Sequence, residues 1–112
     1  MSDLKQIGLS AKADQELKRL REEQRFASEM DGYRLAIALA LRENLEPDWD
    51  GKDRRNKYAA TAVDPTGELL EALHLFRPEM TDSPARALQA LADVGVMYMA
   101  KEFDRGKNPV CP

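Results

Sequence analysis

The residue types that most often carry out chemistry are scarce in this chain of 112 residues. His74 is the only histidine, and neither a cysteine nor a second histidine lies at the spacing of a metal site. Glu71 precedes it by three positions, a pairing that exposed helices carry routinely. Cys111, the only cysteine, lies beside the final proline with no base placed to activate its thiol. A glycine-rich phosphate loop and the GxSxG and HExxH motifs are also missing. We therefore expect no enzyme, and neither a metal nor a cofactor.

A basic cluster at Lys52–Lys57 is the best candidate for contacts with phosphate. It places four cationic side chains within six positions, between Trp49 and Tyr58. Cations bind phosphate and aromatic rings stack on bases, so this composition suits nucleic-acid binding. A solvated loop that happens to be basic is the alternative. Trp49 fits either an anchor of the loop on the core or an exposed contact for a partner.

The composition limits the classes of protein to which the chain can belong. Hydrophobic residues make up 43% and charged residues 33%, and the formal net charge is −3 rather than basic. Local patches can still act against the global sign. No apolar run is long enough to span a membrane, and the first residues lack the layout of a signal peptide. Because a single cysteine cannot form an internal disulfide, we expect a cytoplasmic protein with no membrane partner.

The element that organises the rest is the stretch Tyr33–Glu43, which predicts a helix. No polar side chain lies between Leu35 and Leu41, and Ser28 upstream predicts an N-cap with an acidic residue three positions later. An uninterrupted apolar run predicts a helix that is buried on most sides. In so short a chain such burial favours a second subunit. We therefore expect an obligate homodimer, or a tetramer built from it, with this helix at its centre.

A strand and a helix precede that central helix. The loose alternation of Leu4–Leu9 predicts a half-buried strand, which needs a partner strand. Ser10 predicts the N-cap of a helix from Ala11 to about Arg25, whose apolar stripe comprises Ala13, Leu17 and Leu20.

We divide the chain into three parts on these patterns. Residues 1–45 form the predicted dimerisation unit. Residues 46–63 form a basic linker or loop, interrupted by Pro47 and Gly51. Residues 64–112 form a helical part packed on the same core.

Two helices are predicted in the C-terminal part. The first begins directly after the N-cap Asp64 and ends before Pro78. The second begins after Ser83 and runs to about Phe103. Gly95 inside it permits a close helix crossing. The predicted fold class is therefore mainly α, with a short N-terminal strand that pairs in a dimer and two C-terminal helices.

Residues 4–43 resemble the ribbon-helix-helix family of small bacterial regulators. The matching residues are Ile7–Ser10, Leu17 and Leu20, Phe26–Ser28, and Ala36–Leu39. The resemblance implies that two chains pair their strands into a ribbon that enters the DNA major groove, while the second helices form the dimer core. The implied dimer core comprises Ile7, Leu9, Tyr33, Ile37 and Leu41.

The resemblance also implies which residues contact DNA. The outward-facing strand positions are Leu4, Gln6 and Gly8, of which only Gln6 can make a bidentate contact with adenine. Glu29 and Asp31 begin the second helix, where the family binds phosphate, and these carboxylates would repel it. Together with the basic cluster, the predicted DNA contacts are Lys5, Gln6, Lys52, Arg54, Arg55 and Lys57.

Two functions follow, and the sequence leaves both open. The first is a non-enzymatic, dimeric DNA-binding or regulatory protein of ribbon-helix-helix type. The second is an assembly or adaptor subunit that binds a protein, or an antitoxin, although the caps at Asp64 and Ser83 argue against a disordered toxin-binding tail. Residues 52–76 loosely resemble small subunits of bacterial DNA-modification and defence systems. DNA binding requires the cations to share one side of the molecule, whereas an adaptor requires an exposed apolar patch.

Overall fold

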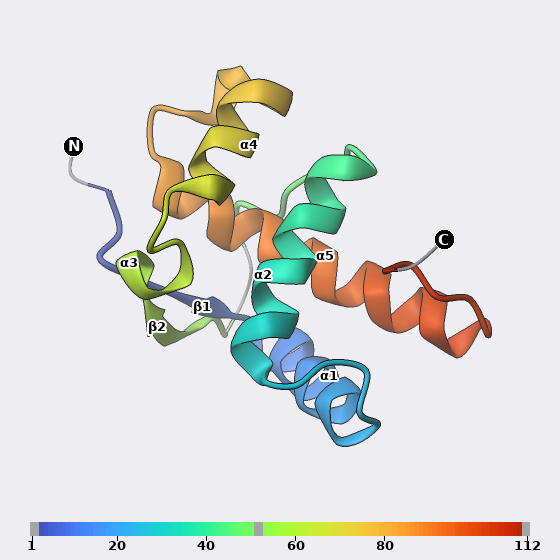
Figure 1. The fold of residues 1–112 in the computed structure, drawn as a ribbon. Coiled ribbons are helices and arrows are strands. Elements are labelled where there is room, and N and C mark those ends of the chain that lie inside the picture. The colour runs from blue at the N-terminus through green and yellow to red at the C-terminus, as the bar shows by residue number, and fades with distance from the viewer. Residues whose placement is uncertain (1–2, 51–52, 111–112) are drawn as a thin grey trace.

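The computed structural model describes residues 3–50 and 53–110. In that part of the chain, five α-helices, one 3₁₀-helix and two strands form the fold (Figure 1). In chain order they are β1 (Gln6–Leu9), α1 (Ala11–Glu22), α2 (Glu29–Arg42), β2 (Arg55–Ala59), α3 (Ala60–Val63), α4 (Glu68–Phe76), η1 (Pro78–Met80) and α5 (Pro84–Asp104). The prediction of a mainly helical protein with a short N-terminal strand is confirmed. Two residues singled out above, Lys52 and Cys111, lie outside the described residues.

The first two helices begin at the predicted caps. The Ser10 hydroxyl accepts a hydrogen bond from the Ala13 amide at 3.3 Å, and the Ser28 hydroxyl accepts one from the Asp31 amide at 3.1 Å. Helix α1 ends at Glu22, three residues earlier than expected. Gln24 takes a positive φ of 62°, and such a residue closes a helix C-terminus.

The core lies where α5 crosses α2, near the middle of both helices (Figure 1). A Cβ atom on Gly95 would overlap the backbone of Ala36, so the absence of a side chain lets the two helices approach closely. The predicted close crossing at Gly95 is thus confirmed. Leu41 is 4% exposed, and the other four residues of the expected dimer core are at most 2% exposed within this single chain. Their burial therefore no longer argues for a second subunit, and the homodimer stays a prediction.

Strand β1 finds its partner in the same chain. It pairs antiparallel with β2, which lies within the segment expected to be a linker. Residues 46–63 were expected to be a basic linker or loop with weak strand character at residues 58–63, and the structure has β2 and the short helix α3 in this segment. The rings of Tyr58 in β2 and Tyr33 in α2 pack in a T-shaped arrangement, with ring centroids 5.2 Å apart. The local sequence favours a strand here only weakly, and contacts with residues far away in the sequence stabilise it.

Gly8 lies between β2 and two side chains of the core. The pairing register shifts between Ile7 and Gly8, and a Cβ atom on Gly8 would overlap the Arg55 carbonyl. Away from β2, the Gly8 amide donates to Gln89 Oε1 and its carbonyl accepts from the Tyr33 hydroxyl, both at 2.9 Å. Gly8 is buried, which corrects the expectation that it faces outward.

The C-terminal helices begin differently from the prediction. Helix α4 begins at Glu68 because the Asp64 carboxylate accepts hydrogen bonds from the amides of Leu69 and Leu70, five and six residues later. At the start of α5 the Asp3 carboxylate, and not the Ser83 side chain, accepts the amide hydrogen bonds of the first turn. Residues 3–50 and 53–110 contain no helix long and apolar enough to cross a membrane.

Candidate functional site

Arg54, a predicted DNA contact, lies in the interior. Its Nε donates to the Asp93 carboxylate at 2.8 Å, and the side chains are 12% and 4% exposed. Asp93 also accepts hydrogen bonds from the backbone and side chain of Ser10. Arg54 further donates to the Asp48 carbonyl. These contacts join the start of α1, α5 and the segment before β2, so the Arg54 guanidinium is bound within the fold.

Lys57 is also bound within the chain. Its ammonium contacts Asp14 of α1 at 2.9 Å and Glu29 of α2 at 2.6 Å. Burial lowers the pKa of Lys57, but the ion pairs that its ammonium makes with the two carboxylates raise it, and the net shift is upward. For Asp14, burial raises the pKa, yet hydrogen bonds from Lys57 and Lys18 bring it below the ordinary value of 3.8. Lys57 therefore joins the starts of α1 and α2 to β2.

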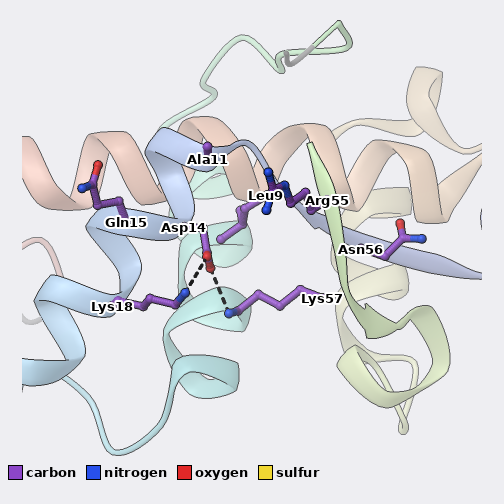
Figure 2. Close-up of a pocket in the computed structure, with 8 residues that line it drawn as sticks. All are labelled: Leu9, Ala11, Asp14, Gln15, Lys18, Arg55, Asn56 and Lys57. Carbon is purple, nitrogen blue, oxygen red and sulfur yellow. Dashed lines mark ion pairs between the residues drawn. The ribbon is translucent and has the colours of Figure 1, made fainter. Parts of the chain in front are cut away.

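Asp14 and Lys57 line a cleft of about 510 Å³ between α1 and β2 (Figure 2). Lys18 reaches the same Asp14 carboxylate from the α1 side, at 3.0 Å. Arg55, at the start of β2, is exposed and also lines the cleft. Two of the three cations of the cleft thus share a carboxylate, which reduces the field available to a bound phosphate.

Five of the six predicted DNA contacts lie in the described part of the chain, and three of these five are exposed: Lys5, Gln6 and Arg55. Arg55 lies opposite Leu9 at one end of the ribbon, whereas the Lys5 carbonyl accepts from the Ala60 amide at the other end. Lys5 and Arg55, the two exposed cations among the described contacts, therefore lie at opposite ends of the ribbon.

Helix α4 presents apolar side chains to solvent. Leu73 is its only buried residue, while Leu75 is 77% exposed and Phe76 is 57% exposed. The adaptor hypothesis expected a protein interface on the surface of the last two helices, but sequence reasoning did not single out Leu75 or Phe76. A signal for them was available, because six of the nine residues of α4 are apolar and they extend around the helix beyond one stripe.

A groove of about 500 Å³ adjoins this helix, between α2 and the segment from α3 to α4. Leu35 and Ala38 from α2 and Leu69 from α4 give it an apolar lining. Its charged lining comprises Asp31, Arg34, Asp64 and Glu68. We call this feature the α2–α4 groove.

The region around the groove is acidic. Residues 64–83 hold five carboxylates and one arginine, a net charge of −4, so the remaining residues of the −3 chain carry a net +1. Arg34, the cation of the groove, donates to the carbonyls of Val63 and Ala62 at 2.8 and 2.9 Å. The Arg34 guanidinium is therefore bound within the chain.

The remaining candidates acquire no neighbours that suggest catalysis. His74 is exposed on α4, and Trp49 is 44% exposed on the connection that follows α2. Across the described ranges, no three or more His, Cys, Asp or Glu side chains are grouped so as to hold a metal ion. Comparison with known proteins gave no match among family models, curated proteins or solved structures. The ribbon-helix-helix resemblance thus rests on its sequence motifs.

Proposed function

We propose that this chain is a non-enzymatic adaptor that binds another protein through α4 and the α2–α4 groove. The observation that carries the proposal is the exposure of two adjacent large apolar side chains, Leu75 at 77% and Phe76 at 57%. Burying one such side chain fully is worth about 1.5–3 kcal/mol. A partner that covers both gains much of this free energy, which the isolated chain leaves unused.

The distribution of charge supports the same choice. DNA binding was expected to require several cations on one side, and Arg54 and Lys57 are instead bound to carboxylates of the fold. An adaptor requires an exposed apolar patch beside polar residues, and α4 supplies one.

Site-specific photo-crosslinking in the source cells tests the proposal. A photoreactive phenylalanine analogue replaces Leu75 in one variant and Lys12, exposed on α1, in the control. We expect a single protein adduct from position 75, identified by mass spectrometry, and none from position 12. Loss of the adduct in a Phe76→Ser background supports the proposal further. Equal adducts from both positions, or none from either, would contradict it.

DNA binding is the second candidate, and one observation favours it. A two-stranded ribbon forms within a single chain and carries exposed Gln6 and Arg55, and the DNA major groove admits such a ribbon. Duplex binding by anisotropy at two salt concentrations is the test, with Lys5→Ala/Arg55→Ala beside the wild type. Arg54 is left intact because it is part of the fold. Salt-sensitive binding that the double variant weakens would favour DNA, and no binding at low salt would exclude this candidate.

A further inference from the structure

We infer that the occupant of the α2–α4 groove is a basic amphipathic helix of the partner protein. The inference rests on the proposed adaptor function and specifies the chemistry of its partner. Two features carry it: the apolar side chains that α2 and α4 contribute to the groove, and the sign of the surrounding charge.

The groove lies at the N-terminal end of α4, and the exposed side chains of Leu75 and Phe76 lie at the other end of the same helix. Leu69 and Phe76 are seven residues apart and therefore share one side of the helix. At that end the Arg77 guanidinium donates to Asn44 Oδ1 at 3.0 Å, which holds the C-terminal ends of α4 and α2 together. Two neighbouring helices with apolar side chains between them suit a third helix, which buries its own apolar stripe there.

An extended peptide fits this surface less well than a helix. A partner that adds as a strand needs an exposed sheet edge with unpaired amides and carbonyls. One wall of the groove is α2 and the other is the segment from residue 63 to residue 69, so neither wall is a strand of the β1–β2 sheet. A partner therefore gains its affinity from side-chain packing, and an amphipathic helix presents the required stripe at every third or fourth residue.

The charge around the groove selects a basic partner. Asp31 and Glu68 are exposed carboxylates of its lining, and Glu71 is exposed one turn along α4. Arg34, the one cation of the lining, donates to backbone carbonyls and lies 3.9 Å from the Asp31 carboxylate, so the lining holds three carboxylates against one guanidinium. A second copy of this chain would bring the same acidic surface against it, and like charges repel. Lysine or arginine flanking an apolar stripe complements the groove.

A pair of synthetic peptides tests the inference directly. One is a labelled amphipathic helix of about 18 residues, five turns, with leucine on one face and lysine elsewhere. Its twin carries glutamate in place of every lysine. By fluorescence anisotropy with the full chain, we expect the basic peptide to bind at least about tenfold more tightly than its twin, a preference that shrinks as salt is added.

Two variants locate the binding. Ala38→Arg places bulk and positive charge in the groove at an exposed position of α2, and we expect at least about a tenfold loss of affinity. Gln15→Arg adds the same charge at an exposed position of α1 and should leave binding unchanged. Glu68→Gln/Glu71→Gln should weaken binding of the basic peptide, whereas Glu22→Gln/Glu23→Gln on α1 should not. Circular dichroism confirms that each variant is folded.

Three results would overturn the inference. The first is equal binding of both peptides, and the second is undiminished binding to folded Ala38→Arg. The third is a concentration-dependent dimer, seen by analytical ultracentrifugation, that Ala38→Arg abolishes, because a second copy would then occupy the groove. If the photoreactive group at position 75 captures a protein while the basic peptide does not bind, only the partner chemistry fails. If neither gives a signal, the adaptor function fails as well.

Discussion

The two long C-terminal helices, α4 and α5, differ in what they do with their side chains. Helix α5 buries thirteen of its twenty-one residues, including the polar Gln89 and Asp93. Helix α4 is more apolar in composition and buries only Leu73. The burial of these two helices therefore follows their position in the fold and not their hydrophobicity. Helix α5 crosses the centre of the molecule, whereas α4 covers one side of α2 and leaves its own outer side open.

The two buried polar residues of α5, Gln89 and Asp93, are tolerated in the core because each has a hydrogen-bond partner. Asp93 binds Arg54 and Ser10, and Gln89 binds the Gly8 amide. Burying a polar group without a partner is costly, so these contacts decide whether the core is stable. The apolar residues of α4 have no such constraint, and their exposure leaves free energy available for binding. Four experiments test how much the buried and the exposed side chains contribute to the stability of the fold.

The largest effect is expected for Asp93→Asn. The substitution leaves the Arg54 guanidinium buried without a counter-charge, and breaking a buried pair in this way costs about 3–5 kcal/mol. Urea denaturation measures the loss in the free energy of unfolding. The control is Asp53→Asn at an exposed position that already has a positive φ of 55°, where we expect a change within about 0.5 kcal/mol. Similar values for the two variants would mean that the buried pair contributes little to stability.

Gly95→Ala should destabilise the crossing of α2 and α5. The added Cβ atom overlaps the Ala36 backbone, and overpacking of this kind costs about 3 kcal/mol. Gly67→Ala is the comparison, because its Cβ meets nothing within 4 Å and only the positive φ of 78° opposes it, at about 1 kcal/mol. Chemical denaturation ranks the two variants. A milder effect at Gly95 than at Gly67 would contradict the close approach of the helices.

Acid should weaken the ion cluster that joins α1, α2 and β2. Because the pKa of Asp14 lies below its ordinary value of 3.8, the folded state binds this proton less tightly than the unfolded state does. The contribution of Asp14 to stability is complete above the unfolded pKa and is lost as the pH falls through the lower folded value. The free energy of unfolding should therefore fall more steeply for the wild type than for Asp14→Asn between about pH 5 and pH 3. Parallel curves would show that Asp14 does not contribute.

The smallest effect on stability is expected on the outer side of α4. Leu75→Ser/Phe76→Ser should change the free energy of unfolding by no more than about 0.5 kcal/mol, because both side chains are already exposed. Leu73→Ala, at the buried position of the same helix, should cost about 3 kcal/mol. Thermal or chemical denaturation separates them. A large loss in the double variant would mean that these side chains stabilise the fold and are not reserved for a partner.

Much of the fold was predictable because its signals are local. Ser10 and Ser28 cap the helices that follow them, Pro78 lies just beyond the end of α4, and Gly95 marks a close crossing. Each of these signals acts within a few residues or through the size of one side chain. The central helix was also predicted, with its apolar run buried, although the chain buries that run by itself.

The parts that escaped prediction depend on residues far apart in the sequence. The sequence showed only weak strand character, at residues 58–63, and β2 forms at residues 55–59, where β1 pairs with it and Tyr33 packs on Tyr58. Arg54 looked like a surface cation because its partner is 39 residues away. A usable signal did exist, since Gln89 and Asp93 occur four residues apart within the apolar sequence of α5, a spacing that places both on one side. The sequence of α4 is apolar beyond one stripe, but which of its sides stays exposed depends on where the other helices pack.

The hydrogen bonds at Gly8 and Ser10 also bear on how the chain reaches its native state. The amides of these residues bind Gln89 and Asp93, which follow 81 and 83 residues later. During synthesis the N-terminal strand therefore waits for nearly the whole chain before its contacts with α5 can form. Contacts across such long sequence separations slow folding, since a large loop must close before they are made. A truncated or stalled product that ends before α5 would leave the apolar side of α2 exposed, and such species tend to aggregate.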